Sequence, residues 1–193
     1  MRKRVLLMIL GLALVIAASQ TARAQLISVK TCGETLGASG EYVLKNDLNC
    51  NSPTGDINAV LITASNVTFH LAGHTISSSV CDLNRTVIGI FVVGGTTNVK
   101  IDGGNVSGFN SGVQLSASNS TVRGMKITGA CLFGIGVQSD GNHIETNTLS
   151  GNSTGVLLLN ATNAHVRSNY LWNNVSAGAA ISGSTCIRTA GGK

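Results

Sequence analysis

The sequence predicts an all-β fold, a parallel β-solenoid, and three observations lead to it. Short runs of Val, Ile and Leu alternate with Gly, Asn and Ser, which favour turns. Beyond the N-terminal apolar run, no segment has a sustained helical period. A tetrapeptide that opens with glycine and is mainly apolar recurs at steps of 23, 22, 21 and 23 residues. It begins at Gly89, Gly112, Gly134, Gly155 and Gly178.

Two more apolar positions keep step with this motif, so each repeat offers two or three short strands. The second position is occupied by Val99, Val122, Ile144 and Val166, and the third by Val106, Ile127, Leu149 and Leu171. One unit cannot bury its apolar side alone, whereas a stack of units can. A leucine-rich repeat would need a helical stretch and the consensus LxxLxLxxN, which are missing. The pattern predicts about five to six coils of about 22 residues, about 4.8 Å apart.

The N-terminus has the pattern of a secretory signal peptide over residues 1–24. Basic residues at positions 2–4 precede an apolar run from 5 to about 18, and Ala-Arg-Ala precedes Gln25. That run is shorter than a comfortable membrane span. We therefore expect cleavage before Gln25, a secreted or periplasmic protein, and no membrane attachment after cleavage. An uncleaved N-terminal anchor is the alternative.

Cleavage changes the charge of the chain. The full sequence has 13 Lys and Arg against 8 Asp and Glu, a net charge of +5. Four of the basic residues lie in the signal segment, so the mature chain has 13 − 4 = 9 of them and a net charge of 9 − 8 = +1. This balance does not favour nucleic acid as a partner. Few charges with many Val, Ile and Leu also argue against a disordered chain.

The mature chain, 193 − 24 = 169 residues, is long enough for one domain. We assign residues 25–56 to an N-terminal cap with the first strands, 57–185 to the coils and 186–193 to a C-terminal tail. The chain ends in "CIRTAGGK" without an obvious cap for the last coil. An open coil exposes strand edges. Self-association through the C-terminal coil is therefore one expectation.

One repeat is longer than the others. From Val67 to Val99 is 32 residues, and the surplus over one coil is "SSSVCDLNRT", residues 77–86. Insertions into a solenoid fall on one face, which is often the binding face. A neutral surface loop is the alternative.

The repeat resembles that of right-handed parallel β-helix proteins of the pectate-lyase-like superfamily. The segments "CGETLGASGEYVLKNDLNC" (32–50) and "NVTFHLAGHTI" (66–76) are similar to the N-terminal part of secreted bacterial members. The resemblance covers roughly residues 30–185. It implies the fold and says little about function, because one fold hosts many activities.

All five cysteines lie in the mature chain, at positions 32, 50, 81, 131 and 186. Export permits disulfides. We expect Cys32–Cys50 to close the N-terminal cap, and the resembling proteins place cysteines similarly. We also expect a disulfide between Cys81 in the inserted loop and Cys131 in a turn two coils on. This assignment gives Cys186 no partner. No Cys/His spacing indicates a metal site, and none is predicted.

Stacking converts sequence offsets into columns of side chains. If the second apolar position points inward, the residues that follow it point outward, namely Lys100, Arg123, Glu145 and Arg167. The residues that precede it form another outward column, Asn98, Thr121, His143 and His165. In the first coil the same reading places Thr68 above Lys100 and His70 above Asp102.

One face would thus collect much of the sparse charge of the mature chain. We predict that it binds polysaccharide, and an acidic one in particular, because guanidinium groups bind carboxylates bidentately while Asn, Thr and Ser meet sugar hydroxyls. The ligand-binding candidates are Lys100, Asp102, Arg123, His143, Glu145, His165 and Arg167. A ladder of exposed ion pairs, each worth less than about 1 kcal/mol, is the alternative.

A lyase or epimerase acting on uronic-acid polymers would use the same face. A base would take the proton beside a neutralised carboxylate, and the catalytic candidates are Lys100, Arg123, His143 and His165. Calcium would enter only with this alternative, because the resembling lyases that use calcium hold it with clustered acids. No cofactor is otherwise predicted.

The acids needed for catalysis are sparse. Asp102 and Glu145 are expected two coils apart with Arg123 between them. The clustered Asp residues and the Gly-His-Gly segment of the resembling polygalacturonases are missing, since "SDGNH" (139–143) does not match. His74 is expected to stabilise a turn by a hydrogen bond rather than to bind a metal.

A third outward column lies two residues past each repeat glycine. Its members are Phe91, Gln114, Gly136, Leu157 and Ala180. Phe91 and Leu157 there are candidates for a protein contact. A structural or adhesive module is therefore the third function that the sequence leaves open.

Overall fold

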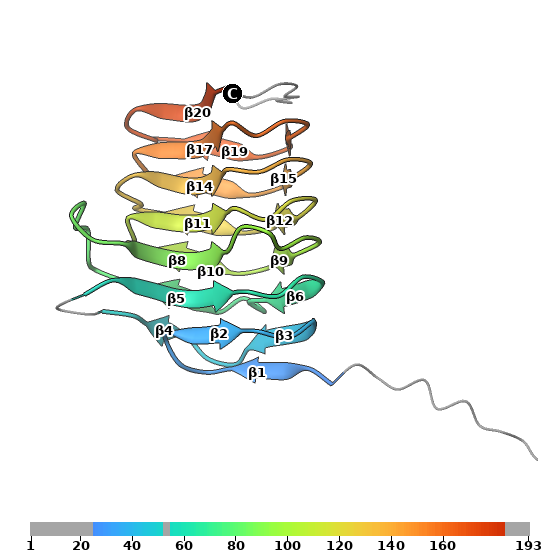
Figure 1. Cartoon of the computed structure of the whole chain (residues 1–193). Helices are drawn as coiled ribbons and strands as arrows, with labels where there is room; N and C mark the ends of the chain where they lie inside the picture. Colours follow the sequence, from blue (N-terminus) through green and yellow to red (C-terminus); the bar gives the residue numbers. More distant parts are fainter. Residues whose placement is uncertain (1–24, 52–54, 184–193) are drawn as a thin grey trace, which may run out of the picture.

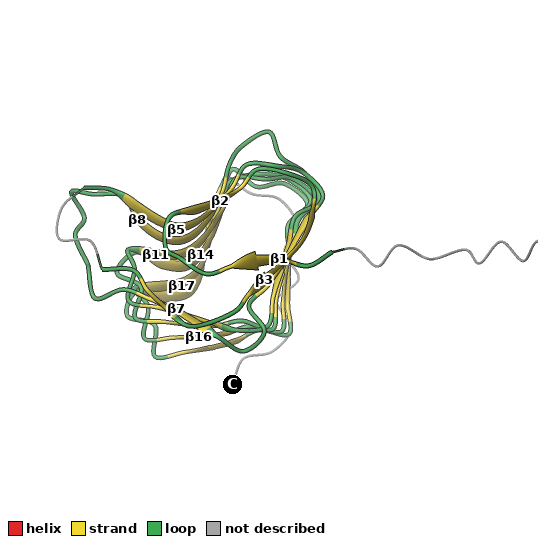
Figure 2. Cartoon of the chain, turned by 90° about the horizontal axis from the view of Figure 1, so that it is seen from below, coloured by secondary structure: helices red, strands yellow, loops and turns green. Residues whose placement is uncertain are grey.

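The computed structural model describes residues 25–51 and 55–183, which form a stack of coils built from three parallel sheets (Figure 1). Each coil places a strand in each sheet, and seen along the stack the sheets enclose a common interior (Figure 2). The described residues form strands and turns without a helix. The predicted all-β parallel solenoid is confirmed. Within the same residues, no helix is long and apolar enough to cross a membrane.

The three sheets are called A, B and C. Sheet A contains β1 (Ile27–Val29), β3 (Gly40–Leu44), β6 (Val67–His70), β9 (Lys100–Asp102), β12 (Thr121–Arg123), β15 (His143–Glu145) and β18 (His165–Arg167). Sheet B contains β2 (Glu34–Leu36), β5 (Ile57–Ile62), β8 (Val87–Val92), β11 (Ser111–Leu115), β14 (Phe133–Val137), β17 (Thr154–Leu159) and β20 (Ala177–Ser182). Sheet C contains β4 (Leu48–Asn49), β7 (Thr75–Ser77), β10 (Asn105–Ser107), β13 (Lys126–Thr128), β16 (Thr148–Ser150) and β19 (Tyr170–Trp172).

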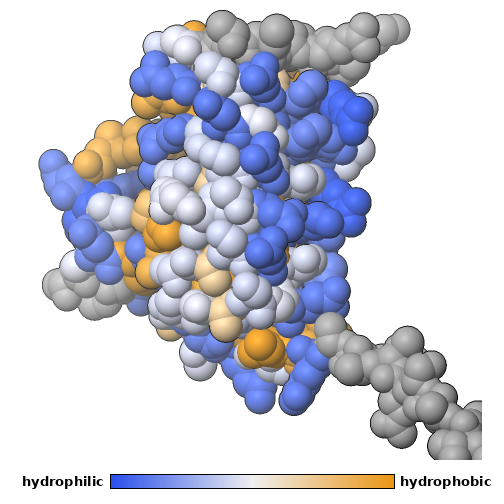
Figure 3. Space-filling view, turned by 45° about the vertical axis from the view of Figure 1, so that its right-hand side comes forward, coloured by the Kyte–Doolittle hydropathy of each residue, from blue (hydrophilic) through white to orange (hydrophobic). Residues whose placement is uncertain are grey.

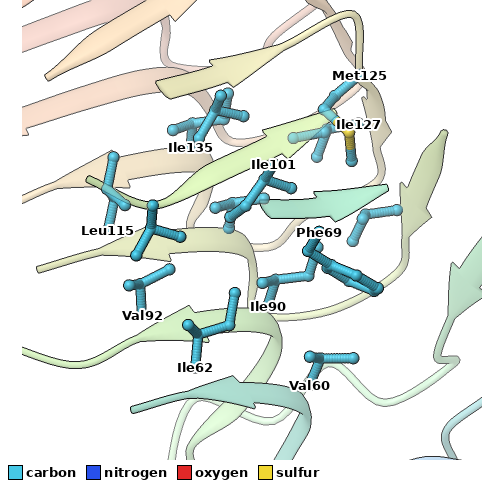
Figure 4. Packing of buried hydrophobic residues seen from close by; sticks show 14 of the residues in the cluster. Val60, Ile62, Phe69, Ile90, Val92, Ile101, Leu115, Met125, Ile127 and Ile135 are labelled. Carbon is cyan, nitrogen blue, oxygen red and sulfur yellow. The ribbon is translucent and has the colours of Figure 1, made fainter. Parts of the chain in front are cut away.

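The interior is filled by columns of apolar side chains, one or two from each sheet. In sheet A the column includes Phe69, Ile101, Val122 and Ile144, all fully buried. Figure 4 shows Ile90 and Val92 of sheet B and Ile127 of sheet C pointing into the same interior. Every strand contributes its inward residues to one continuous core, which explains why the apolar positions recur once a coil.

The structure corrects the predicted alignment of one coil. Val122 pairs with Ile101, and Val99 lies in the turn before β9. Both Val99 and Ile101 are fully buried. A shift of two residues keeps every side chain on the same face of a strand, so the apolar pattern alone does not distinguish the two alignments. The outward columns of side chains shift with this alignment.

Stacked asparagines close two corners of the coil. Between sheets A and C, Asn147 Nδ2 donates to Asn169 Oδ1 (2.9 Å) and to the carbonyl of Val122 (3.0 Å). Its Oδ1 accepts from the backbone N–H of Met125 at 3.0 Å. Asn152 makes the equivalent bonds between sheets C and B. Buried turns that have no strand partner thereby satisfy their backbone polar groups.

The inserted segment is a loop between β7 and β8, close to the predicted range of 77–86. Both expected disulfides are present: Cys32–Cys50, with Cα atoms 5.6 Å apart, and Cys81–Cys131, at 6.1 Å. The second fastens the loop to the turn before β14. The predicted signal peptide (1–24), the predicted tail (186–193) and Cys186 lie outside the described residues.

Strands β1 to β4 fall in the segment assigned as the N-terminal cap, and they already belong to the three sheets. Seen from below, β1 crosses the lower end of the stack (Figure 2).

His74 stabilises the turn between β6 and β7, as expected. Its Nδ1 lies 3.2 Å from Asp47 Oδ1, and Asp47 also accepts from the N–H of Thr75.

Candidate functional site

The predicted binding face is the outer face of sheet A, where two columns of side chains run from coil to coil. The first column consists of Thr68, Lys100, Thr121, His143 and His165. The second consists of His70, Asp102, Arg123, Glu145 and Arg167. We call these ten residues the charged strip. Hydrophilic surface follows the right-hand side of Figure 3, over sheet A, from the bottom of the stack to the top.

The columns differ from the prediction at one coil. The predicted sequence Lys100, Arg123, Glu145, Arg167 is wrong, because Asp102 takes the place next to Arg123 and Lys100 lies beside Thr121. Asn98 belongs to the preceding turn, where its Nδ2 donates to Asn66 Oδ1 at 2.8 Å. The places of Thr68 over Lys100 and His70 over Asp102 are confirmed.

The two carboxylates of the charged strip are each held between two basic groups. Asp102 Oδ1 lies 2.6 Å from His70 Nδ1, and its Oδ2 accepts from Arg123 at 3.2 Å. Glu145 Oε1 lies 3.1 Å from His143 Nδ1 and 2.7 Å from an Arg167 nitrogen. Three of these pairs join neighbouring coils within the second column, since parallel stacking puts equivalent residues side by side. The fourth, His143 with Glu145, joins two residues of the same strand.

Groups in both columns of the charged strip face solvent. His143 and His165 stack with ring centroids 4.7 Å apart and planes 12° from parallel. Lys100 is exposed and forms no ion pair with any described residue. The side chains of Arg123 and Arg167 are each 58% exposed although one edge of each guanidinium meets a carboxylate. The strip thus offers cationic groups to a ligand while its acids are neutralised by their neighbours.

The carboxyl of Glu145 shows how strongly the neighbours act. Burial alone raises its pKa, but hydrogen bonds from Arg167 and His143, together with their charges, outweigh burial and hold the pKa below its ordinary value. A lowered pKa in the folded state stabilises the fold above the ordinary carboxyl range, and the gain is lost as pH falls through the lowered pKa.

We therefore expect Glu145→Gln to lower the free energy of unfolding at pH 7 by less than about 1 kcal/mol, because its partners are exposed. The difference from the unmodified protein should be smaller at about pH 3, below the ordinary carboxyl pKa, than at pH 7. Urea unfolding at both pH values measures it. Glu41→Gln on the same sheet is the control, since Glu41 is exposed and forms no ion pair with a described residue. A pH-independent difference would contradict the expectation.

The catalytic candidates are not assembled into a compact set. Lys100 and His165 are three coils apart in the first column, with Thr121 and His143 between them. Asp102 and Glu145 are two coils apart, about 10 Å by the stacking distance, with Arg123 between them as expected. Among the described residues, no three His, Cys, Asp or Glu lie close enough together to hold a metal ion.

A second feature, a hollow on the outer face of sheet B, was missed by the sequence analysis. It has a volume of about 260 Å³ and lies between the end of the inserted loop and strands β8, β11 and β14. Its lining includes Arg85, Ile88, Ser111, Gln114, Phe133 and Gln138. Apolar surface gathers on the left of Figure 3, on the side of sheet B. The insertion and the outward column with Phe91 and Gln114 were the signals that could have indicated it.

The comparison with protein families decides the classification. A family described as "Right handed beta helix region" matches residues 54–191, which is more than half of the chain. The chain belongs to the right-handed β-helix family. Three all-parallel sheets, with one strand from each coil, agree with that membership. The predicted right-handed parallel β-helix is therefore confirmed.

Membership in the right-handed β-helix family establishes the fold and leaves the activity open. Neither the curated proteins nor the solved structures contain a significant match to this β-helix protein. Its two disulfides are typical of a protein that folds in an oxidising environment.

Proposed function

We propose that this β-helix protein is exported and binds an acidic polysaccharide along the charged strip, without cleaving it. The observation that carries the proposal is the line of exposed cationic side chains on one sheet face, Lys100, Arg123 and Arg167. A guanidinium has five N–H donors, and each arginine of the strip uses part of them on its carboxylate partner. The remaining donors can meet the carboxylates of a uronic-acid polymer.

The regular spacing of the strip suits a linear polymer. From β6 to β18 the face spans four steps of about 4.8 Å, or about 19 Å. A chain lying along the stack meets similar side chains at each coil, so several weak contacts act together. Its three fixed cations outnumber its two acids, which gives the strip 3 − 2 = +1 with neutral imidazoles. The predicted signal peptide and the disulfides support a secreted or periplasmic location, where such polymers occur.

Binding to polygalacturonate and alginate, measured by calorimetry with dextran as the neutral polymer, tests the proposal. We expect the double variant Arg123→Gln/Arg167→Gln to bind the acidic polymers at least about tenfold more weakly. Lys45→Gln/Lys126→Gln is the matched control, because it removes the same charge from exposed positions outside the strip. Binding should also weaken as salt concentration rises.

Three results would contradict the proposal: no binding to either acidic polymer, equal binding to dextran, or equal losses in the strip variant and the control. The ultraviolet absorbance of the same mixtures, with and without calcium, follows unsaturated uronic products. A steady rise in absorbance would show that the polymer is cleaved. The protein would then be a lyase that uses Lys100, His143 or His165 as base, and the proposal of binding without cleavage would be wrong.

A further inference from the structure

We infer that the hollow on sheet B is a second carbohydrate site, which holds one sugar ring and is independent of the charged strip. The hollow has a volume of about 260 Å³. Pockets for drug-sized molecules occupy about 300–1,000 Å³, so this hollow suits a single ring better than several. It lies on a different sheet from the strip, and the two faces have no residue in common.

An aromatic ring forms one wall of the hollow. Phe133 lies in the outward column of Ser111 and Thr154, and its ring extends over the backbone of Gly136. A Cβ at Gly136 would lie 2.7 Å from Cδ2 of that ring, so only glycine lets the ring lie against the strand. Held in this way, the ring is only partly buried and keeps one side toward the hollow. A rigid aromatic face of this kind packs against the apolar C–H face of a sugar.

Polar groups without protein partners line the hollow beside the ring. Ser111 is only 3% exposed, and its hydroxyl makes no hydrogen bond with any described residue. The amide of Gln114, which is partly buried one coil below Gly136, likewise bonds to no described side chain or backbone group. The Ser111 hydroxyl is not fully enclosed by protein, so water or a ligand in the hollow can bond to it. Hydroxyl and amide groups match the hydroxyls of a sugar in both donor and acceptor capacity.

The wall opposite the sheet is held in place before any ligand arrives. The Cys81–Cys131 disulfide anchors the inserted loop. Asn110, itself 3% exposed, accepts from the N–H of Asp82 (3.0 Å) and donates to the carbonyls of Asp82 (2.6 Å) and Arg85 (2.8 Å). A loop fixed in this way loses little freedom when a ligand binds, which favours affinity for a small ligand.

The charge of the lining limits the ligand further. The hollow is lined by one cation, Arg85, whose guanidinium also donates to the carbonyl of Gly55, and by no carboxylate. A cationic ligand is therefore disfavoured, whereas a neutral hexose and its uronic acid share the features that the other groups recognise. Comparison of galactose with galacturonic acid, and of glucose with glucuronic acid, determines whether Arg85 adds to the affinity.

The test measures binding of these four sugars to the mature protein by ligand-observed NMR. We expect at least one sugar to bind, and Ser111→Ala to weaken it about 2- to 12-fold while leaving the melting temperature unchanged, because the hydroxyl has no protein partner. Gly136→Ala should displace the Phe133 ring and weaken binding about tenfold without removing the aromatic residue. Thr154→Ala is the matched control in the same outward column, one coil beyond Phe133 and outside the lining.

Failure of this site is distinguishable from failure of the charged strip. The double variant Arg123→Gln/Arg167→Gln should bind the single sugars as the unmodified protein does, even where it loses acidic polymer. The inference is overturned if none of the four sugars binds, if Ser111→Ala and Gly136→Ala bind as well as Thr154→Ala, or if the strip variant abolishes binding of the single sugars.

Discussion

Replacing Gly112 with valine is expected to lower the free energy of unfolding by about 3 kcal/mol, the upper part of the range for overpacked cores. A Cβ at this position would lie 2.6 Å from the carbonyl oxygen of Gly134 in the next coil, and it would also meet the side chain of Ile127. A side chain can rotate away, but the backbone carbonyl belongs to the neighbouring strand and cannot move without breaking the stack.

Urea unfolding followed by circular dichroism measures this loss. Gly94→Ala is the control, because a Cβ there has only the oxygen of Ser116 nearby, at 3.9 Å, which is ordinary contact. The same close approach recurs between Gly89 and Gly112 and between Gly134 and Gly155. If Gly112→Val and Gly94→Ala are equally stable, the close approach of neighbouring coils is not the reason why glycine recurs at this position of the repeat.

Replacing Asn147 with alanine should cost about 3 kcal/mol or more, because it removes three hydrogen bonds at once from a corner that is shielded from water. Asn147 is 1% exposed. Its loss leaves the N–H of Met125, the carbonyl of Val122 and the side-chain oxygen of Asn169 without this partner. Each buried group left unsatisfied costs about 1–3 kcal/mol.

Thermal and urea unfolding of Asn147→Ala, beside Asn105→Ala, measure the effect. Asn105 lies outward on sheet C, and its two side-chain hydrogen bonds are both 3.3 Å long, so its replacement should cost less than about 1 kcal/mol. Similar losses in the two variants would show that the buried ladder contributes no more than a surface amide does.

The fold was predictable because its cause is local and repeated. Each coil needs the same inward residues, so Ile127, Leu149 and Leu171 recur at a constant spacing even though the surface residues between them vary. The two disulfides were also predictable, since few cysteines were available and the inserted loop placed Cys81 near Cys131. The sequence did not show why glycine recurs at the position of Gly112, because the clash that a side chain would make there involves a carbonyl from the next coil.

The candidate site was predictable only in part. The residues of sheet A that face outward were found correctly from strand alternation, with Arg123, Glu145 and Arg167 in one column. The pairing of Glu145 with Arg167 agrees with the ladder of ion pairs that the sequence offered as an alternative. The partner of Arg123 was missed, because Asp102 enters the column only with the alignment that puts Ile101 inside. A two-residue shift leaves the apolar pattern unchanged while it replaces each charged neighbour.

The sequence by itself determined that this protein is a stack of β-coils with an inserted loop and one charged face, because periodicity and alternation are properties of the chain. Only the tertiary structure decided which charges meet, and that Ser111, Gln114 and Phe133 line one hollow. Residues 111 and 133 belong to successive coils, and a disulfide holds the loop that closes the hollow to the turn just before residue 133. Contacts of this kind depend on the register between coils, which stacking sets and the apolar repeat leaves open.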